Sequence, residues 1–448
     1  MTSQMKRAEM FLVRPGAALA GAVHVGGAKN SVLKLMVACI LAEGRHHLFN
    51  VPRISDVDVM ADLLGTMGVT VNRVGSDHLQ IDTPAILNPD VPYALVERMR
   101  ASVVLPGALL ARCGRAVIHQ PGGDDFGNRP IDFHLRGLEA LGADFTQEPG
   151  YLEARADGLK GTRLVLEYPS HTTTDNLLMA AVLAKGTTII ENSAREPEVV
   201  DLAQMLNGMG ARVSGEGTSR LVVEGVGSLR PAHHRVVSDR VEAATYLAAV
   251  GIAGGEIFVG GANPQHMDML LEKLSEMGMS ISTGTSPLPP DGALGPAGAG
   301  GADVEGIWAS AAGRISCVDV ATLPYPGVAT DYKPLMVTMM CTGSGTGIVS
   351  ENIFAGRFRY IEELRRMGAD ITTEGHHAVV RGVDHLAGAS VTAGDIRAGT
   401  ALVLAGLAAS GETQVKGAAH VDRGYEDFAG KLSTLGADVT RVACDVGA

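Results

Sequence analysis

The stretch LRRMGADI, residues 364–371, ends an amphipathic segment with Met367, places a glycine at position 368 and continues to the β-favouring Ile371. Glycine adopts left-handed backbone conformations without steric cost, so a glycine after a helical pattern marks a helix end. The stretch predicts a helix, a stop glycine and a strand. Five others repeat it: LLGTMGVTV (63–71), LEALGADF (138–145), LNGMGARV (206–213), LSEMGMSI (274–281) and LSTLGADV (432–439).

A second, more apolar segment also recurs six times. Segments that are apolar on nearly every side are typical of helices buried on all faces. Each repeat is therefore predicted to run strand, buried helix, strand, amphipathic helix and hairpin, a βαβαββ unit of an α/β fold. The six copies are NSVLKLMVACILAEG (30–44), RASVVLPGALLARCG (100–114), TTDNLLMAAVLAKG (173–186), DRVEAATYLAAVGIAGG (239–255), DYKPLMVTMMCTGSG (331–345) and GTALVLAGLAASG (399–411).

The spacing of the six stop glycines locates one insertion. Successive glycines are 74, 68, 68, 90 and 68 residues apart. The long step contains TGTSPLPPDGALGPAGAGG, which is rich in proline and glycine, so residues 283–302 are expected to form a mobile insertion outside the packed repeats.

The two ends of the chain look complementary. FLVRPGAALAGAVHVGG (11–27) is similar to the hairpin-and-strand piece AVVRGVDHLAGASVTAG (378–394), whereas the last repeat stops early. The N-terminal strands are therefore predicted to complete the last repeat. Six units would then close as two lobes of three, one formed by residues 29–238 and the other by 1–28 with 239–448. A six-unit solenoid is the alternative.

Composition narrows the class of protein. The formal net charge of −12 argues against nucleic acid or an anionic membrane as partner. Five cysteines without CxxC spacing indicate neither a disulfide framework nor a zinc site; Cys113, which ends an apolar segment, is expected to be buried. The N-terminal apolar run is too short for a signal peptide, and no segment suits a membrane span. A cytoplasmic protein is expected.

Polar residues stand where the six buried helices should begin. Serine, threonine and aspartate are ordinary N-caps, but lysine and arginine in a first turn oppose the helix dipole. If these helix ends converge, they form an anion-attracting site, which predicts a phosphorylated substrate. The residues, in chain order, are Lys29 and Asn30; Arg100; Ser170 and His171; Asp239 and Arg240; Asp331 and Lys333; and Asp395 and Arg397.

The motifs GGAKNS, MRASVV, PGGDDFGNRPIDFHLRGLEALGA, LPYPGVATD, ENIFAGRFRYIEELRRMGAD, GDIRAG and VDRGYEDF occur together nearly from end to end. In this the chain resembles the enolpyruvyl transferases, most closely the branch that uses UDP-N-acetylglucosamine in peptidoglycan synthesis. The resemblance implies a two-lobed inside-out α/β barrel with the active site between the lobes. It also implies transfer of the enolpyruvyl group of phosphoenolpyruvate to a sugar hydroxyl with release of phosphate. No metal or organic cofactor is implied, and a monomer is expected.

The resemblance also implies roles for individual residues. Asp124 in the loop 120–129 would protonate the vinyl carbon, Asp331 would act on the sugar hydroxyl, and the cations would hold phosphoenolpyruvate. For Arg357 and Arg366, a site role and a surface ion pair both remain open. The implied phosphoenolpyruvate ligands are Lys29, Arg129, Arg397 and Arg423. The implied nucleotide and sugar contacts are Asn30, Arg100, Pro130, Ile131, Asp132, Phe133, Ser170, His171 and Ile353.

Three departures from the family pattern bear on function. Asp124 stands where most members have the cysteine that the epoxide fosfomycin alkylates. SHTTT (170–174) replaces the usual SVGAT, and GVATD replaces GFPTD before Asp331. Two changes near the acceptor leave two alternatives open: transfer to a simpler uridine nucleotide such as UMP in nucleoside-antibiotic assembly, and a non-catalytic sugar-nucleotide sensor.

Overall fold

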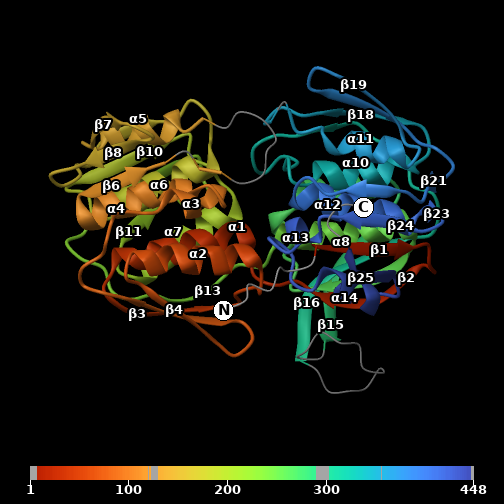
Figure 1. Cartoon of the computed structure of the whole chain (residues 1–448), viewed down its shortest axis with the longest axis horizontal. Coiled ribbons are helices and arrows are strands. Elements are labelled where there is room, and N and C mark those ends of the chain that lie inside the picture. Colours follow the sequence, from red (N-terminus) through yellow and green to blue (C-terminus); the bar gives the residue numbers. More distant parts are fainter. Residues whose placement is uncertain (1–7, 120, 123–129, 289–301, 355, 445–448) are drawn as a thin grey trace. The chain divides into compact units, whose positions relative to one another are not determined.

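The computed structural model describes residues 8–119, 121–122, 130–288, 302–354 and 356–444. Helices and strands alternate along the chain, which confirms the α/β class (Figure 1). The described residues divide into two compact units. Unit 1 holds residues 8–26 and 238–444, and unit 2 holds residues 27–237, apart from the undescribed residues within these ranges. Each unit has a hydrophobic core of its own.

In unit 2, three helices are buried and three amphipathic helices lie outside them. Helix α4 contacts both α1 and α6, and nine of the ten residues of α1 are buried. The buried helices are α1 (Lys29–Ala38), α4 (Leu105–Cys113) and α6 (His171–Ala181), extended by the 3₁₀ turns η1 (Cys39–Leu41) and η2 (Arg100–Val104). The amphipathic helices are α2 (Ser55–Thr66), α5 (Asp132–Ala140) and α7 (Pro197–Gly208), and α3 (Tyr93–Val96) is an additional short helix.

The sheets of unit 2 each contain a strand that follows a buried helix. One sheet has the order β13 (His233–Arg235), β3 (Gly44–Phe49), β5 (His78–Thr83), β4 (Thr70–Val74). A second has the order β11 (Arg212–Ser214), β12 (Arg220–Glu224), β10 (Thr187–Glu191), β9 (Arg163–Val165). The third, with three strands, is β6 (Arg115–Ile118), β8 (Tyr151–Arg155), β7 (Asp144–Glu148).

Unit 1 repeats this plan. Helices α8, α10 and α12 contact one another pairwise, and Figure 1 shows them side by side. They span α8 (Arg240–Ala253), α10 (Lys333–Cys341) and α12 (Ile396–Leu407), and are accompanied by α9 (Asp268–Glu276), α11 (Tyr360–Arg366), α14 (Phe428–Thr434), α13 (Ala418–Val421) and η3 (Pro264–His266).

The sheets of unit 1 have the same strand order as the four-stranded sheets of unit 2: a parallel edge strand, the strand after the buried helix, then an antiparallel pair. They are β2 (Leu19–His24), β14 (Gly255–Gly260), β16 (Ala302–Ala311), β15 (Ser280–Leu288); β17 (Val320–Ala321), β18 (Thr346–Ser350), β20 (His377–Arg381), β19 (Asp370–Glu374); and β22 (Ser390–Thr392), β24 (Thr413–Lys416), β1 (Ala8–Arg14), β25 (Asp438–Cys444). A two-stranded sheet joins β21 (Leu386–Ala387) and β23 (Ala409–Ser410).

The stop-glycine prediction is confirmed. All six glycines follow an amphipathic helix and have φ between 90° and 102°, a backbone conformation that residues other than glycine rarely adopt. At five of them no atom lies within 4 Å of where a Cβ would be, so backbone conformation rather than crowding selects glycine. The six are Gly68, Gly142, Gly210, Gly278, Gly368 and Gly436.

The N-terminal strand completes the last sheet, as the sequence predicts. Strand β1 pairs antiparallel with β25 over seven residue pairs, from Ala8↔Cys444 to Arg14↔Asp438. Its other edge pairs with β24, from Met10↔Lys416 to Val13↔Thr413. Residues more than 400 positions apart thus share one sheet.

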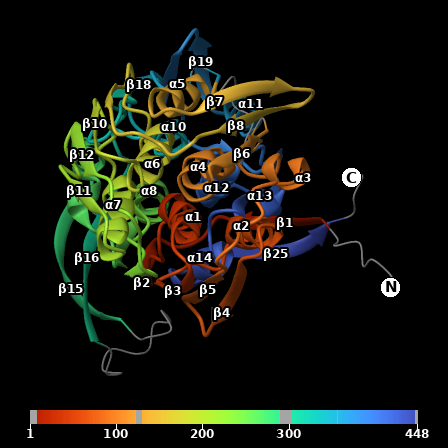
Figure 2. The same ribbon diagram turned by 90° about the vertical axis from the view of Figure 1, so that its left-hand side faces the viewer.

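The expected insertion at 283–302 needs correction. Residues 283–288 and 302 belong to β15 and β16, which pair antiparallel from Ser280↔Ser310 to Leu288↔Ala302. This hairpin extends away from the rest of unit 1 (Figures 1 and 2). Thr283 and Thr285 favour a strand, and Pro287 is tolerated because β15 is an edge strand. The proline and glycine content of the whole segment concealed this pattern. Residues 289–301 lie outside the described part of the chain.

No helix in the described part of the chain combines the length and hydropathy that crossing a bilayer requires.

Candidate functional site

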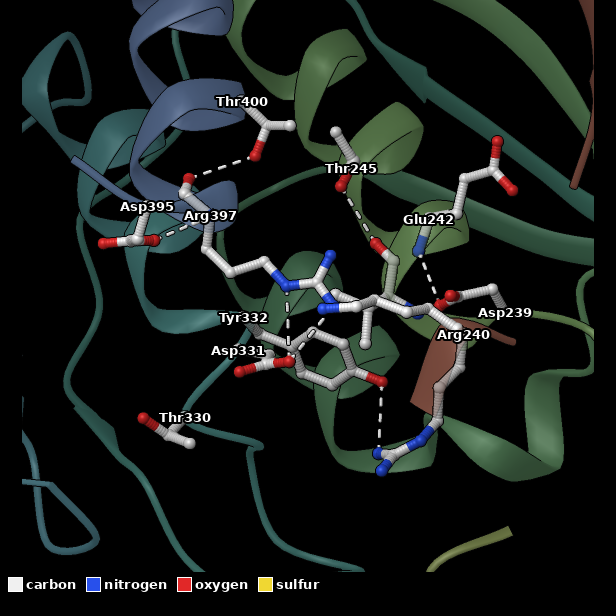
Figure 3. A network of polar contacts seen from close by, with 12 residues as sticks. Asp239, Arg240, Glu242, Thr245, Thr330, Asp331, Tyr332, Asp395, Arg397 and Thr400 are labelled. Carbon is white, nitrogen blue, oxygen red and sulfur yellow. Dashed lines mark hydrogen bonds and ion pairs between the residues drawn. The ribbon is translucent and has the colours of Figure 1, made fainter. Parts of the chain in front are cut away.

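In unit 1, the first turns of α8, α10 and α12 lie together (Figure 3). Asp239 and Asp395 are the N-caps of α8 and α12. Asp239 Oδ1 accepts from the backbone N–H groups of Val241 and Glu242 at 2.8 and 3.0 Å. Asp395 Oδ1 likewise accepts two backbone N–H groups at 2.9 Å. These aspartates have the ordinary capping role.

The carboxylate of Asp331 lies between two arginines. Arg357 Nη1 donates to Oδ1 at 2.8 Å, and Arg397 donates to Oδ2 through Nη2 at 3.2 Å and Nε at 3.3 Å. Both arginine side chains are 5% exposed, whereas Asp331 is 23% exposed. The two guanidinium groups fix the orientation of the carboxylate and leave part of it accessible.

The structure distinguishes a site role from a surface ion pair for Arg357 and Arg366. Arg357 is buried, so the surface-pair alternative is wrong for it. Arg366 is exposed and pairs with Glu363 at 3.4 Å, so for Arg366 the surface pair is confirmed. The two arginines differ in position. Arg357 precedes α11 and contacts Asp331, whereas Arg366 is the last residue of α11 and its side chain is exposed.

Aromatic hydroxyls support the arginines of unit 1. Arg397 Nη1 donates to the hydroxyl of Tyr425 at 2.9 Å, and that hydroxyl lies 2.7 Å from Thr245 Oγ1. Arg240 Nη1 donates to the hydroxyl of Tyr332 at 3.4 Å (Figure 3). Because a guanidinium held at several points loses rotational freedom before any ligand arrives, these contacts preorganise cationic groups.

Arg423 lies in the turn that follows α13 and is half-buried. Its neighbour Asp422 accepts both terminal nitrogens of Arg441 at 2.6 Å, which anchors this turn to strand β25. The same segment supplies Tyr425, which contacts Arg397. Ile353 is half-buried, and its N–H donates to Glu351 Oε1 at 2.8 Å.

In unit 2, Lys29 begins α1 and pairs with Asp56 of the first turn of α2. Lys29 Nζ lies 3.0 Å from Asp56 Oδ2, and the two side chains are 11% and 3% exposed. Asn30 follows and is half-buried.

The starts of α5 and α6 meet around His134. Its Nδ1 accepts from Asn176 Nδ2 at 3.0 Å, and Asn176 Oδ1 accepts from the N–H of Gly107 at 2.7 Å. Thr172 Oγ1 lies 3.4 Å from His134 Nε2. Burial, with help from the charge of Arg100, lowers the pKa of His134 to about 3, so the imidazole is neutral. Burial also lowers the pKa of Arg100, which is half-buried.

The pKa of His134 makes stability pH-dependent. Its folded-state pKa lies below the value of about 6.5 expected after unfolding, so the unfolded chain gains a proton first as the pH falls. Between pH 7 and pH 5, the free energy of unfolding should fall by about 2 kcal/mol through this residue. His134→Asn should lose that part of the pH dependence in urea unfolding, whereas His385→Asn, at an exposed position, should keep it. Equal slopes in the two variants would contradict the assignment.

The motif RPIDF is only partly placed. Pro130 is exposed, and Ile131 is half-buried against the core of unit 2 at the start of α5. Asp132 is exposed and pairs with Arg136 at 2.8 Å, and Phe133 lies under the guanidinium of Arg136 at 5.0 Å. Asp124 and Arg129 lie outside the described residues.

His171 of the unusual SHTTT stretch has buried charged neighbours. Ser170 caps α6 by accepting the N–H of Thr173 at 3.4 Å. His171 Nε2 lies 2.5 Å from Lys34 Nζ, which pairs with Asp175 at 2.8 Å. Burial raises the pKa of Asp175 to about 6, against the lowering effect of Lys34. His171 therefore contacts the buried Lys34–Asp175 ion pair, a contact that the neighbouring sequence does not indicate.

Several of these contacts had no strong signal in the sequence. Asp56 and Lys34 lie in stretches with the pattern of an ordinary helix, and only their proximity in space links them to Lys29 and His171. Tyr425 stands in the motif VDRGYEDF, but only the structure shows that it contacts Arg397. Within the described residues, no group of three or more histidine, cysteine or acidic side chains is placed to hold a metal ion.

A family model described as EPSP synthase (3-phosphoshikimate 1-carboxyvinyltransferase) matches residues 13–432. The chain therefore belongs to this family of carboxyvinyl, or enolpyruvyl, transferases. It is 46% identical over 439 residues to the UDP-N-acetylglucosamine 1-carboxyvinyltransferase of Nocardia farcinica, covering 97% of this chain and 99% of that protein. The protein of the same name from Myxococcus xanthus is 44% identical over 435 residues, with 97% and 99% covered.

Solved structures agree on the fold. The enolpyruvyl transferase NikO from Streptomyces tendae superimposes with a TM-score of 0.83 at 22% identity, covering 98% of this chain and all of that one. An EPSP synthase from Acinetobacter baumannii gives a TM-score of 0.73 at 19% identity, covering 97% of this chain and all of that one. At these identities the likeness shows the fold alone.

Proposed function

We propose that this enzyme transfers the enolpyruvyl group of phosphoenolpyruvate to the 3-hydroxyl of UDP-N-acetylglucosamine and releases phosphate, the first committed step of peptidoglycan synthesis. The observation that carries the proposal is full-length similarity, at 44–46% identity, to proteins named for that reaction. The arrangement of Asp331 between Arg357 and Arg397 supports it, because the reaction needs a positioned carboxylate and cations for an anionic substrate.

The proposed chemistry is addition followed by elimination. The sugar oxygen bonds to C2 of phosphoenolpyruvate while its proton passes to a base and C3 gains a proton. C3 then loses a proton, the C2–O bond to phosphate breaks, and the enolpyruvyl ether remains. We assign the base or orienting role to Asp331 and the donor role to Asp124. Phosphate and carboxylate would be held by Lys29, Arg129, Arg397 and Arg423, since arginine binds both groups bidentately.

The acceptor contacts are assigned by position. The neutral His134 joins the starts of α5 and α6, so the RPIDF and SHTTT stretches can serve one ligand. Pro130 would offer an apolar face to uracil and Asp132 would accept its N–H. The remaining proposed contacts are Asn30, Arg100, Ile131, Phe133, Ser170, His171 and Ile353.

The architecture is part of the proposal. The shared sheet order and the two sets of three buried helices support six βαβαββ units in two lobes of an inside-out barrel. The lobes would be residues 1–28 with 239–448, and residues 29–238 with the catalytic loop 120–129. We expect a cytoplasmic monomer that needs no cofactor.

A panel of acceptors tests the function. We expect phosphate release from phosphoenolpyruvate with UDP-N-acetylglucosamine, and little or none with UMP, uridine or shikimate 3-phosphate. Release with UMP alone would replace the proposal by transfer to a simpler uridine nucleotide, which the SHTTT and GVATD departures keep as the second candidate. Nucleotide binding without release for any acceptor would identify a sensor.

A further inference from the structure

Lys333 and Glu351 form a fully buried ion pair in unit 1. The Nζ–Oε2 distance is 3.0 Å and both side chains are 0% exposed. Lys333 Nζ also donates to the backbone carbonyl of Arg357 and lies 3.9 Å from the ring centre of Phe358. The sequence places Lys333 among the cations expected to meet an anionic substrate; its burial excludes that role.

Such a pair is weak evidence for stability. Removing two charges from water costs about as much as, or more than, their attraction returns, so apolar residues of similar volume serve a core equally well. Because the pair adds little net stability, the role of Lys333 and Glu351 follows from the other contacts of Glu351.

Glu351 directs the Thr330 hydroxyl, which contacts Arg357, a partner of Asp331. Thr330 Oγ1 lies 2.7 Å from Glu351 Oε2 and donates its one proton there, because an ionised carboxylate only accepts. The hydroxyl oxygen then accepts from Arg357 Nη1 at 3.0 Å, and the same nitrogen donates to Asp331 Oδ1 at 2.8 Å. A continuous chain of hydrogen bonds therefore runs from the buried pair through Thr330 and Arg357 to Asp331.

The same carboxylate holds the segment that follows strand β18. Glu351 Oε1 accepts from Thr322 Oγ1 at 2.7 Å and from the N–H groups of Ile353 and Phe354 at 2.8 and 3.1 Å. Ile353 is a proposed acceptor contact. One buried group thus supports both the proposed base and the segment beside the acceptor.

We infer that Lys333, Glu351 and Thr330 are positioning residues that orient Arg357, and through it the Asp331 carboxylate, for the transfer reaction. This inference rests on the proposed function. Lys333 keeps Glu351 ionised. Burial raises the pKa of Glu351, but Lys333, Thr330 and Thr322 together lower it by more than burial raises it, so the net shift is downward. Without Lys333, Glu351 would take up a proton, and the Thr330 hydroxyl would lose its fixed direction.

Thr330→Val and Thr330→Ser form the central test. Valine has nearly the shape of threonine but lacks the hydroxyl, whereas serine keeps it. Loss of one hydrogen bond to a charged group corresponds to about a tenfold change in rate. We expect Thr330→Val to lower kcat about tenfold with the KM for UDP-N-acetylglucosamine near that of the unmodified enzyme, and Thr330→Ser to restore most of kcat.

Thr338→Val is the matched control. Thr338 is buried on α10, and its hydroxyl has no hydrogen-bond partner among the described residues. The Thr338→Val variant should leave kcat unchanged. Equal kcat for Thr330→Val and Thr338→Val, in an enzyme whose unmodified form turns over, would overturn the inference and leave the proposed function standing. An unmodified enzyme that releases no phosphate with any acceptor would overturn both.

Lys333→Met gives an independent readout through the pH profile. The groups that face Lys333 are Glu351, Arg357 and Asp395, with the Tyr360 ring at 6.0 Å. In Lys333→Met, kcat should fall most at low pH, where Glu351 binds a proton, and recover as the pH rises. The double variant with Thr330→Val should be no slower than the slower single variant, since both break one chain. Additive losses or an unshifted pH profile would contradict the inference.

Discussion

Replacing Asp331 by alanine is expected to lower kcat for phosphate release by about 10²–10⁴-fold while UDP-N-acetylglucosamine still binds, because the loss of one positioned acid or base has an effect of this size. In the proposed reaction Asp331 acts on the reacting hydroxyl, whereas most of the binding energy comes from the uridine and phosphate groups. The measurements are steady-state phosphate release and calorimetric titration with the nucleotide.

Asp331→Asn separates charge from shape. The two neighbouring guanidinium groups are nearly buried, so removing the carboxylate leaves two cations without their shared partner, which is destabilising. Asparagine keeps one acceptor oxygen and the volume. We expect it to be almost as slow as alanine but closer to the unmodified enzyme in melting temperature.

Asp384→Ala serves as the control for a lost acidic residue. Its side chain is 91% exposed and pairs with Arg314 at 3.1 Å, an interaction that contributes little to stability. Its kcat should equal that of the unmodified enzyme. A near-normal kcat in Asp331→Ala would remove Asp331 from the mechanism.

The unmodified enzyme is expected to resist fosfomycin, and Asp124→Cys is expected to become sensitive while remaining active. A thiolate is a strong, soft nucleophile toward an epoxide, whereas a carboxylate is a weak one. A thiol also keeps its proton to about pH 8.5, so the cysteine variant should hold its rate to higher pH than the natural aspartate.

The other cysteines require a control. The expectation that Cys113 is buried is wrong: it is exposed at the C-terminal end of α4, where the apolar pattern of the helix has already ended. Cys39 and Cys341 are buried. Inactivation should therefore be compared in chains with and without Cys113→Ala, with the alkylated peptide identified by mass spectrometry. Rapid inactivation of the natural enzyme, or an active Asp124→Cys enzyme that stays unlabelled, would show that residue 124 does not occupy the donor position.

Local patterns carried much of the fold. A helix, a glycine at positive φ and a strand are decided within about ten residues, so repeats such as LRRMGADI could be recognised without tertiary information. The buried helices were equally visible, because a segment apolar on every side has only one stable environment in water. The caps Asp239, Asp395 and Ser170 were recognisable for the same reason, since a cap bonds its own helix.

What the tertiary structure alone decided is which distant side chains meet. Arg357 and Arg397 stand 26 and 66 positions after Asp331, and nothing in the intervening sequence states that their guanidinium groups share one carboxylate. Lys333 and Arg240 are both the first residue of a buried helix. Lys333 forms a fully buried ion pair with Glu351, whereas Arg240 contacts Tyr332. The physical reason is that the hydrophobic pattern sets which face of a helix is buried, whereas a charged group's role depends on the partners that the packed elements bring within about 3 Å, and that distance follows only from the assembled fold.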